Sequence, residues 1–284
     1  MGTRTLDRYL YNYAMIFNLP SFDKIETLIR EVTETEIMPR FKSLASEETW
    51  KKGSGSIVTT ADIAAEKMLA SQLPLLLPGS VVVGEEMVHD SPDILKRLDG
   101  SEPVWVLDPV DGTSNFAANS PDFGVMVALV VRRETVAGWI YRPVEDEMYT
   151  CERGNGAFLN GAKLNIRSSV RNLEKMVGSL GGFLRKRTNL PERFSRVTAS
   201  GCIALDYCSL AKGVLDFAHY RGAHVWDHAP GWLLHSEAGG YNRCLDDTIY
   251  LAGLPGEGGL LLASDRETWE MLRKPIKEAL DTLR

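Results

Sequence analysis

Three separated segments of the 284-residue sequence carry carboxylates at positions where strands or loops are expected to end. The segments are Gly84-Glu85-Glu86, Asp108-Pro109-Val110-Asp111-Gly112-Thr113-Ser114 and Trp226-Asp227. The hydrophobic run Val104–Leu107 predicts a strand that delivers Asp108 to its end, where Pro109 would stop it. Asp108 and Asp111 are three residues apart across a tight turn, so both carboxylates can face one point, which a straight strand would not allow. Oxygen ligands of this kind suit hard cations such as Mg²⁺.

The residues after Asp111 predict an anion site. Gly112 lets the backbone approach a ligand closely, and Thr113 and Ser114 would present N–H groups and hydroxyls at the start of a helix or turn. Carboxylates beside these donors would repel a phosphate unless divalent cations lay between them. A plain turn is the alternative, because Asp-Gly pairs are common turn formers. The presence of Glu85 and Asp227 elsewhere in the sequence favours a metal and anion site over a plain turn.

Composition sets the class of protein. Apolar residues make up 44% and charged residues 25% of the chain, as in ordinary soluble globular proteins. The net charge of −6 shows no basic excess, so we expect no direct nucleic-acid binding. Four dispersed cysteines without a CxxC pair indicate free thiols in a reducing compartment. No apolar run reaches the ~18 residues of a membrane span and no secretory signal is evident, so we expect a cytoplasmic protein.

The order of elements predicts an α/β layered sandwich. Helical spacing over 23–44 and 61–73 is followed by strand patterns that predict a mostly antiparallel sheet, at 81–83, 104–107, 123–131, 135–141, 148–151 and 157–159. In the second half, helices at 202–211, 229–238 and from 265 onward alternate with strands at 214–217 and 259–263. We divide the chain into an N-terminal extension of uncertain role (1–20), helices and a sheet that carry most metal ligands (21–168), and a smaller α/β half with Asp227 (169–284).

Several segments together resemble the inositol monophosphatase family. Besides the three acidic segments, the matches are Val58-Thr59-Thr60-Ala61-Asp62, Gly154 to Gly161, Gly201 to Asp206, and His235-Ser236-Glu237-Ala238-Gly239-Gly240. The resemblance runs from about residue 20 to the C-terminus. It implies the fold of the inositol monophosphatase and sugar phosphatase type. It also implies a lithium-sensitive hydrolase of small phosphomonoesters that uses two to three Mg²⁺ ions, most simply as a homodimer.

The resemblance also implies roles for individual residues. Glu85, Asp108 and the carbonyl of Val110 would bind the metal that holds the attacking water, with Glu85 counted among the catalytic residues. Asp108, Asp111 and Asp227 would bind a second metal that stabilises the leaving oxygen. Asp62 and Thr113 resemble the pair that orients and deprotonates the water. The remaining residues would contact substrate: Gly112, Thr113, Ser114, Gly201, Ile203 and Asp227.

Structural roles remain open for several of these residues. Thr59 to Asp62 fits a capping box, and Asp227 could be an N-cap. We expect Glu86 to support a ligand rather than be one, and His224, His228 and His235 to serve packing or surface roles. Cys202 and Cys208 are expected to be core thiols. The pair Lys51-Lys52 is expected to lie in a solvated loop, and an approach to the substrate is the alternative.

Substrate and competing functions also stay open. The family reads inositol hydroxyls with an acidic residue at the position of Tyr220 and has a small residue at that of Ile203, so fructose 1,6-bisphosphate, 3′-phosphoadenosine 5′-phosphate and histidinol phosphate are alternatives. Arg221, if it faces the pocket, would favour a second anionic group. A haloacid-dehalogenase phosphatase would space its aspartates two apart rather than three. Some bacterial relatives act as partners of the transcription machinery in antitermination.

Overall fold

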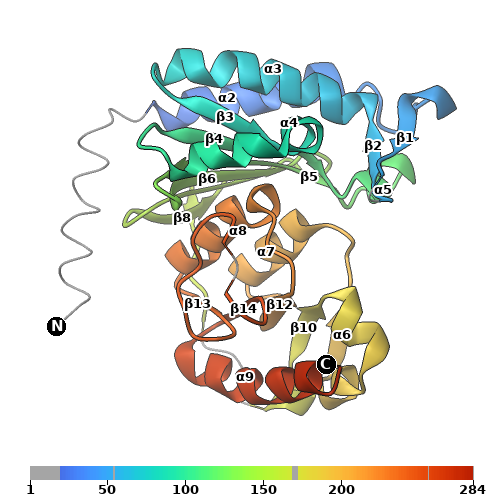
Figure 1. Ribbon diagram of the computed structural model, residues 1–284, viewed down its shortest axis with the longest axis vertical. Coiled ribbons are helices and arrows are strands. Elements are labelled where there is room, and N and C mark those ends of the chain that lie inside the picture. Colours follow the sequence, from blue (N-terminus) through green and yellow to red (C-terminus); the bar gives the residue numbers. More distant parts are fainter. Residues whose placement is uncertain (1–19, 54, 168–171, 255, 284) are drawn as a thin grey trace.

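The computed structural model describes residues 20–53, 55–167, 172–254 and 256–283, and it confirms the layered α/β sandwich (Figure 1). Helices α2 and α3 cover one face of a first sheet, α7 and α8 lie between this sheet and a second one, and α6 and α9 cover the far face of the second sheet. The predicted extension 1–20 lies, except for Pro20, outside the described residues. None of the described helices is long and apolar enough to cross a membrane.

The first sheet has seven strands in the order β3-β4-β5-β6-β7-β8-β9, and only β3 and β4 run parallel. Their bounds are β3 Val81–Gly84, β4 Val104–Asp111, β5 Gly124–Val131, β6 Glu134–Arg142, β7 Glu147–Glu152, β8 Gly156–Leu159 and β9 Ala162–Lys163. Every residue of β4 and β5 is buried, because helices cover both faces at the centre of the sheet. This buried centre carries Asp108 and Asp111.

The second sheet has the order β11-β10-β12-β14-β13. Its strands are β10 Val177–Leu180, β11 Arg196–Thr198, β12 Phe217–Tyr220, β13 Tyr241–Cys244 and β14 Leu260–Ala263. Because β10, β11 and β12 are parallel, their C-terminal ends share one edge. The loops at that edge lead into α6, α7 and α8. A small ribbon, β1 Thr49–Lys51 with β2 Ile57–Thr59, stands apart from both sheets.

The α-helices are α2 Phe22–Val32, α3 Thr60–Leu76, α4 Glu85–Asp90, α5 Thr113–Ala117, α6 Gly182–Arg187, α7 Ile203–Ala211, α8 Val225–Glu237 and α9 Arg266–Asp281. The remaining helical segments are a π-helical turn, η1 Thr33–Ile37, and the 3₁₀ segments η2 Ser46–Glu48, η3 Pro92–Asp99, η4 Leu173–Lys175 and η5 Leu190–Arg193. The apolar face of α2 packs on the sheet through residues such as Ile25 and Ile29, and α3 contributes Leu69 and Leu73.

The bounds of some elements differ from those predicted. The helix expected over 23–44 is α-helical only to Val32 and continues as the π-helical turn η1. The strand expected at 214–217 lies at Phe217–Tyr220, because Val214 is exposed and belongs to the turn after α7. The helix expected at 229–238 begins at Val225, which brings Asp227 into its first turn. The proposed division at residues 168 and 169 falls in the segment 168–171, outside the described residues, and stays a prediction.

Candidate active site

An irregularity in β4 brings two carboxylates together. The pairing of β4 with β5 shifts register between Asp108 and Asp111. Residues three apart point to opposite faces of a regular strand, so this bulge allows both side chains to face one point. Asp227 reaches the same place from the first turn of α8. One carboxylate oxygen from each of Asp108, Asp111 and Asp227 lies within 4.8 Å of the others.

The electrostatics of this three-carboxylate group are unfavourable without a cation. Burial and the neighbouring carboxylates raise the pKa of Asp108 and of Asp227 well above the ordinary range. Burial raises the pKa of Asp111 to about 6, although Ala204 N–H and Cys202 Sγ–H donate to its Oδ2. Asp108 Oδ1 is buried and has no hydrogen-bond partner among the described residues. Three clustered acids with an orphaned oxygen fit a site for a divalent cation.

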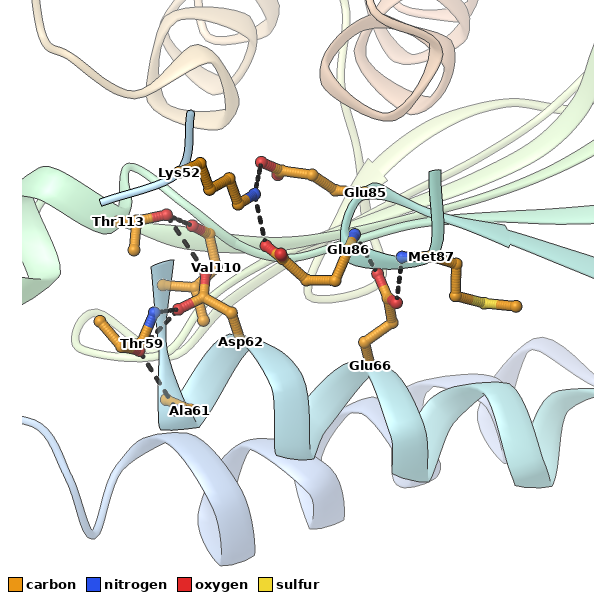
Figure 2. Close-up of polar contacts among 10 residues, drawn as sticks. All are labelled: Lys52, Thr59, Ala61, Asp62, Glu66, Glu85, Glu86, Met87, Val110 and Thr113. Carbon is orange, nitrogen blue, oxygen red and sulfur yellow. Dashed lines mark hydrogen bonds and ion pairs between the residues drawn. The ribbon is translucent and has the colours of Figure 1, made fainter. Parts of the chain in front are cut away.

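Glu85 and Glu86 begin α4 directly after β3, and they share a lysine. Lys52 Nζ lies 2.7 Å from Glu85 Oε1 and 2.7 Å from Glu86 Oε1 (Figure 2). The expectation of a solvated lysine pair is therefore wrong for Lys52, whose side chain is only 5% exposed, while Lys51 is exposed as expected. Lys52 is buried because two carboxylates satisfy its ammonium. Glu85 is not a member of the three-carboxylate group.

Asp62 caps helix α3 and also contacts Thr113, the residue expected to act with it on the water. Its Oδ2 accepts from Thr59 N–H at 2.8 Å and Thr59 Oγ1 at 2.6 Å, which completes a capping box at the start of α3. Its Oδ1 faces Thr113 Oγ1 at 3.2 Å, and that hydroxyl also lies 2.9 Å from Val110 O (Figure 2). The single hydroxyl proton can serve only one of these acceptors at a time. Burial, opposed by the bonds from Thr59, raises the pKa of Asp62 to about 7.

Gly112 makes the turn between β4 and α5. Its φ of +85° favours glycine, and a Cβ there would lie 2.8 Å from Asp122 O. Thr113 follows as the first residue of α5, and Ser114 is exposed. Asn115 Nδ2 donates to Asp122 O at 2.8 Å and to Ser200 O at 2.9 Å. This amide ties the first half of the site to the loop before α7.

The loop before α7 carries the remaining predicted substrate residues. Gly201 is exposed with a φ of +71°, and Ile203 is the first, half-buried residue of α7. The Cys202 side chain is buried and its Sγ lies 3.0 Å from Asp111 Oδ2, so this thiol does more than fill the core. Cys208 is fully buried, and all four cysteines are free.

Sequence reasoning missed two buried acids beside the site. Glu66 accepts from the backbone N–H groups of Glu86 and Met87, each at 2.9 Å. Its only sequence signal is its position one helical turn after Asp62. Asp206 accepts hydroxyl protons from Ser179 at 2.6 Å and Ser200 at 2.8 Å. Tyr220 OH also donates to Asp206, at 3.1 Å.

The histidines take packing or surface positions. His228 and His235 are each 1% exposed, and burial lowers the pKa of His228 to about 3 and that of His235 to about 4. His228 Nδ1 pairs with Tyr207 OH at 3.0 Å. His224 is exposed and stacks on Trp226.

The sequence is similar to those of known proteins. The family model described as "Inositol monophosphatase family" matches residues 21–280. An inositol-1-monophosphatase of Mesorhizobium japonicum is 33% identical over 240 residues, which are 81% of this chain and 86% of that protein. The Nus factor SuhB of Haemophilus influenzae is 30% identical over 238 residues, or 80% and 85% of the two chains.

A solved structure agrees with the fold. The Thermotoga maritima IMPase superposes with a TM-score of 0.77 and 25% identity, covering 93% of this chain and 100% of that one. The family model spans nearly the whole chain, including every acidic segment described above. The chain therefore belongs to the inositol monophosphatase family and is an enzyme of the phosphoric monoester hydrolase type.

Proposed function

We propose that the chain hydrolyses a small phosphorylated metabolite in a Mg²⁺-dependent reaction, with inositol monophosphate as the first candidate substrate. The observation that carries this proposal is the buried group of Asp108, Asp111 and Asp227, whose oxygens lie within 4.8 Å of one another. The orphaned Asp108 Oδ1 supports it, because a buried carboxylate oxygen needs a partner. The names of several relatives support the substrate.

The acidic residues would hold two to three divalent ions. Asp108, Asp111 and Asp227 would bind them directly, and Glu85 and the Val110 carbonyl would complete the set of ligands. When bound, such ions supply charge stabilisation to a transferring phosphoryl group and make water a stronger nucleophile. Lys52 would offset part of the negative charge of Glu85 and Glu86 at neutral pH.

Asp62 and Thr113 would orient the water that attacks phosphorus. When Thr113 donates its only hydroxyl proton to Asp62 Oδ1, the lone pairs of its Oγ1 can accept a proton from that water. Asp62 would then receive the proton through this hydroxyl. Positioned acid–base help of this kind contributes about 10²–10⁴ in rate.

The start of α5 would hold the phosphate. Gly112 and Thr113 would direct backbone N–H groups toward it, and Ser114 is exposed beside them. The positive φ of Gly112 creates this turn, so other residues would strain it. Gly201 and Ile203 would contact the rest of the substrate together with Asp227.

One observation favours a different substrate of the same reaction. The Tyr220 hydroxyl donates a hydrogen bond to Asp206, and position 220 has no carboxylate that could bind inositol hydroxyls. Next to it, Arg221 is exposed with its guanidinium 4.1 Å from the centre of the Phe183 ring. A cation at this edge favours a substrate with a second anionic group, such as fructose 1,6-bisphosphate or 3′-phosphoadenosine 5′-phosphate; histidinol phosphate is a further candidate.

A panel of phosphomonoesters tests the proposal. Purified protein with Mg²⁺ should release phosphate from at least one of inositol 1-phosphate, fructose 1,6-bisphosphate, 3′-phosphoadenosine 5′-phosphate and histidinol phosphate, and Li⁺ should inhibit it. No release from any of them would count against the proposal. A homodimer and a cytoplasmic location complete it, and light scattering and cell fractionation test them.

A partner role in transcription antitermination is the second candidate, favoured by the similarity to a Nus factor. An Asp108→Asn variant separates the two roles, because it damages the three-carboxylate group and leaves the surface unchanged. If the variant complements a deletion strain, the phenotype arises from binding. If it fails to complement, hydrolysis is required.

A further inference from the structure

Glu66 is a buried carboxylate that the mechanism above does not use. It lies on α3, is 4% exposed, and points toward the junction of β3 and α4 (Figure 2). Its Oε2 accepts from Glu86 N–H and its Oε1 from Met87 N–H, each at 2.9 Å. Both oxygens are therefore used, and both bind the backbone just after Glu85.

These two hydrogen bonds replace a cap that α4 lacks. The first N–H groups of a helix have no partner within the helix, and Gly84, at the N-cap position of α4, has no side chain to accept from them. Glu66 supplies the acceptors from another helix. The peptide groups that follow Glu85 are thus fixed against α3, which also carries Asp62 one turn earlier.

Gly84 leaves the space in which the Glu66 carboxylate lies. A Cβ at position 84 would be 2.2 Å from Glu66 Oε2 and 2.3 Å from its Cδ. The φ of Gly84 is −105°, a value open to any residue, so backbone conformation does not demand glycine here. Glycine is therefore required at position 84 because a larger side chain would overlap with the Glu66 carboxylate.

We propose that Glu66 is a positioning residue that holds Glu85 at the metal centre through the backbone of Glu86 and Met87. The inference rests on the proposed function, in which Glu85 takes part in binding Mg²⁺. One helix then sets two parts of the chemistry, because α3 places Asp62 directly and Glu85 through Glu66. Glu66 itself touches neither substrate nor metal in this account.

Mg²⁺ binding to the full chain, measured by titration calorimetry without substrate, tests the proposal. Substitution of a residue that orients a metal ligand typically weakens metal binding by about 10–100-fold. Glu66→Ala should therefore raise the Mg²⁺ dissociation constant by about that factor. Glu66→Gln should have a smaller effect, because its amide oxygen still accepts one of the two N–H groups. Lys67→Gln, the neighbouring exposed position on α3, is the matched control and should bind as the wild type does.

A second variant reaches the same carboxylate from the other side. Gly84→Ala should displace Glu66 by its Cβ and weaken Mg²⁺ binding without altering Glu66 itself. In the Glu66→Ala background the same change should add less than threefold, because the clash is gone. Additive effects of the two substitutions would overturn the inference. If Glu66→Ala proved too unstable to measure, an unchanged Mg²⁺ dissociation constant in Gly84→Ala would overturn it.

The outcomes separate this inference from the proposed function. If the wild-type protein binds no Mg²⁺, the proposed function fails and the inference falls with it. If the wild type binds Mg²⁺ and Glu66→Ala, Glu66→Gln and Gly84→Ala change the dissociation constant by less than threefold, only the inference fails. Lower melting temperatures with unchanged affinity would then assign Glu66 a purely structural role.

Discussion

Replacing Asp62 by Asn separates its capping role from its proposed catalytic role. The carboxylate accepts three hydrogen bonds, two from Thr59 through Oδ2 and one from Thr113 through Oδ1. An Asn side chain keeps one acceptor oxygen and places an NH₂ group at the other position. With that oxygen toward Thr59 the cap persists, and Thr113 loses Asp62 Oδ1 as an acceptor and keeps only Val110 O.

The two effects differ in size. One lost hydrogen bond costs about 1 kcal/mol of stability, and removal of a buried carboxylate whose pKa is raised to about 7 offsets part of it. We therefore expect the free energy of unfolding to change by no more than about 1 kcal/mol. Loss of acid–base help should lower kcat by about 10²–10⁴, which corresponds to about 3–5 kcal/mol of barrier. KM should change little, because the interaction acts mainly in the transition state.

The assay is phosphate release at saturating Mg²⁺, combined with urea unfolding of the same sample. Saturating metal is needed because the substitution removes a negative charge near the cation site. Thr113→Ala should lower kcat by a similar factor, and the double variant should be no slower than the slower single one. Asp62→Asn with kcat within threefold of wild type would refute the reasoning and leave Asp62 a helix cap.

Three further experiments test the role of the metal, the need for glycine in the turn at Gly112, and the effect of burial on His219. A chelator should abolish phosphatase activity and Mg²⁺ should restore it, whereas Ca²⁺ should serve poorly because it prefers longer bonds and more ligands; full turnover in excess chelator would contradict the mechanism. Gly112→Ala should cost roughly 1–3 kcal/mol in urea unfolding, because a Cβ at φ +85° is strained and meets Asp122 O; unchanged stability would contradict the need for glycine. Burial lowers the pKa of His219 to about 4 from 6.5, so its contribution to stability is complete above pH 6.5 and is lost as pH falls toward 4. Between pH 7.5 and pH 5 the wild type should therefore lose about 2 kcal/mol more than His219→Gln, which keeps a donor for Gly258 O; parallel losses would contradict the burial effect.

Local patterns and the family resemblance together predicted the three-carboxylate group. Asp108 follows a hydrophobic run that is typical of a buried strand, and Trp226-Asp227 matches a family segment. Lys52 was misjudged because a lysine beside glycines and serines is typical of a solvated loop. Its partners Glu85 and Glu86 lie more than thirty residues away, and only the tertiary fold brings them to the ammonium.

Glu66 and Asp206 were missed for a related reason. A single acid within a helix pattern is usually a solvated residue, and nothing local shows that Glu66 caps another helix or that Asp206 collects hydroxyls from β10, β12 and the loop before α7. The strand at Phe217–Tyr220 was predicted too early in the sequence because the apolar residues Val214 and Leu215 precede it. Both belong to the turn after α7. Family segments predicted the candidate site, whereas contacts between distant segments required the structure.

The central claim is that Asp108, Asp111 and Asp227 together hold the divalent ions of a phosphatase. Crystals soaked in Mn²⁺, a cation with an anomalous signal that takes similar oxygen ligands, test it directly. The claim predicts anomalous peaks within bonding distance, about 2–2.5 Å, of carboxylate oxygens from all three residues. Crystals of wild-type protein that show no peak at this group, while the same protein turns over substrate with Mn²⁺, would contradict it.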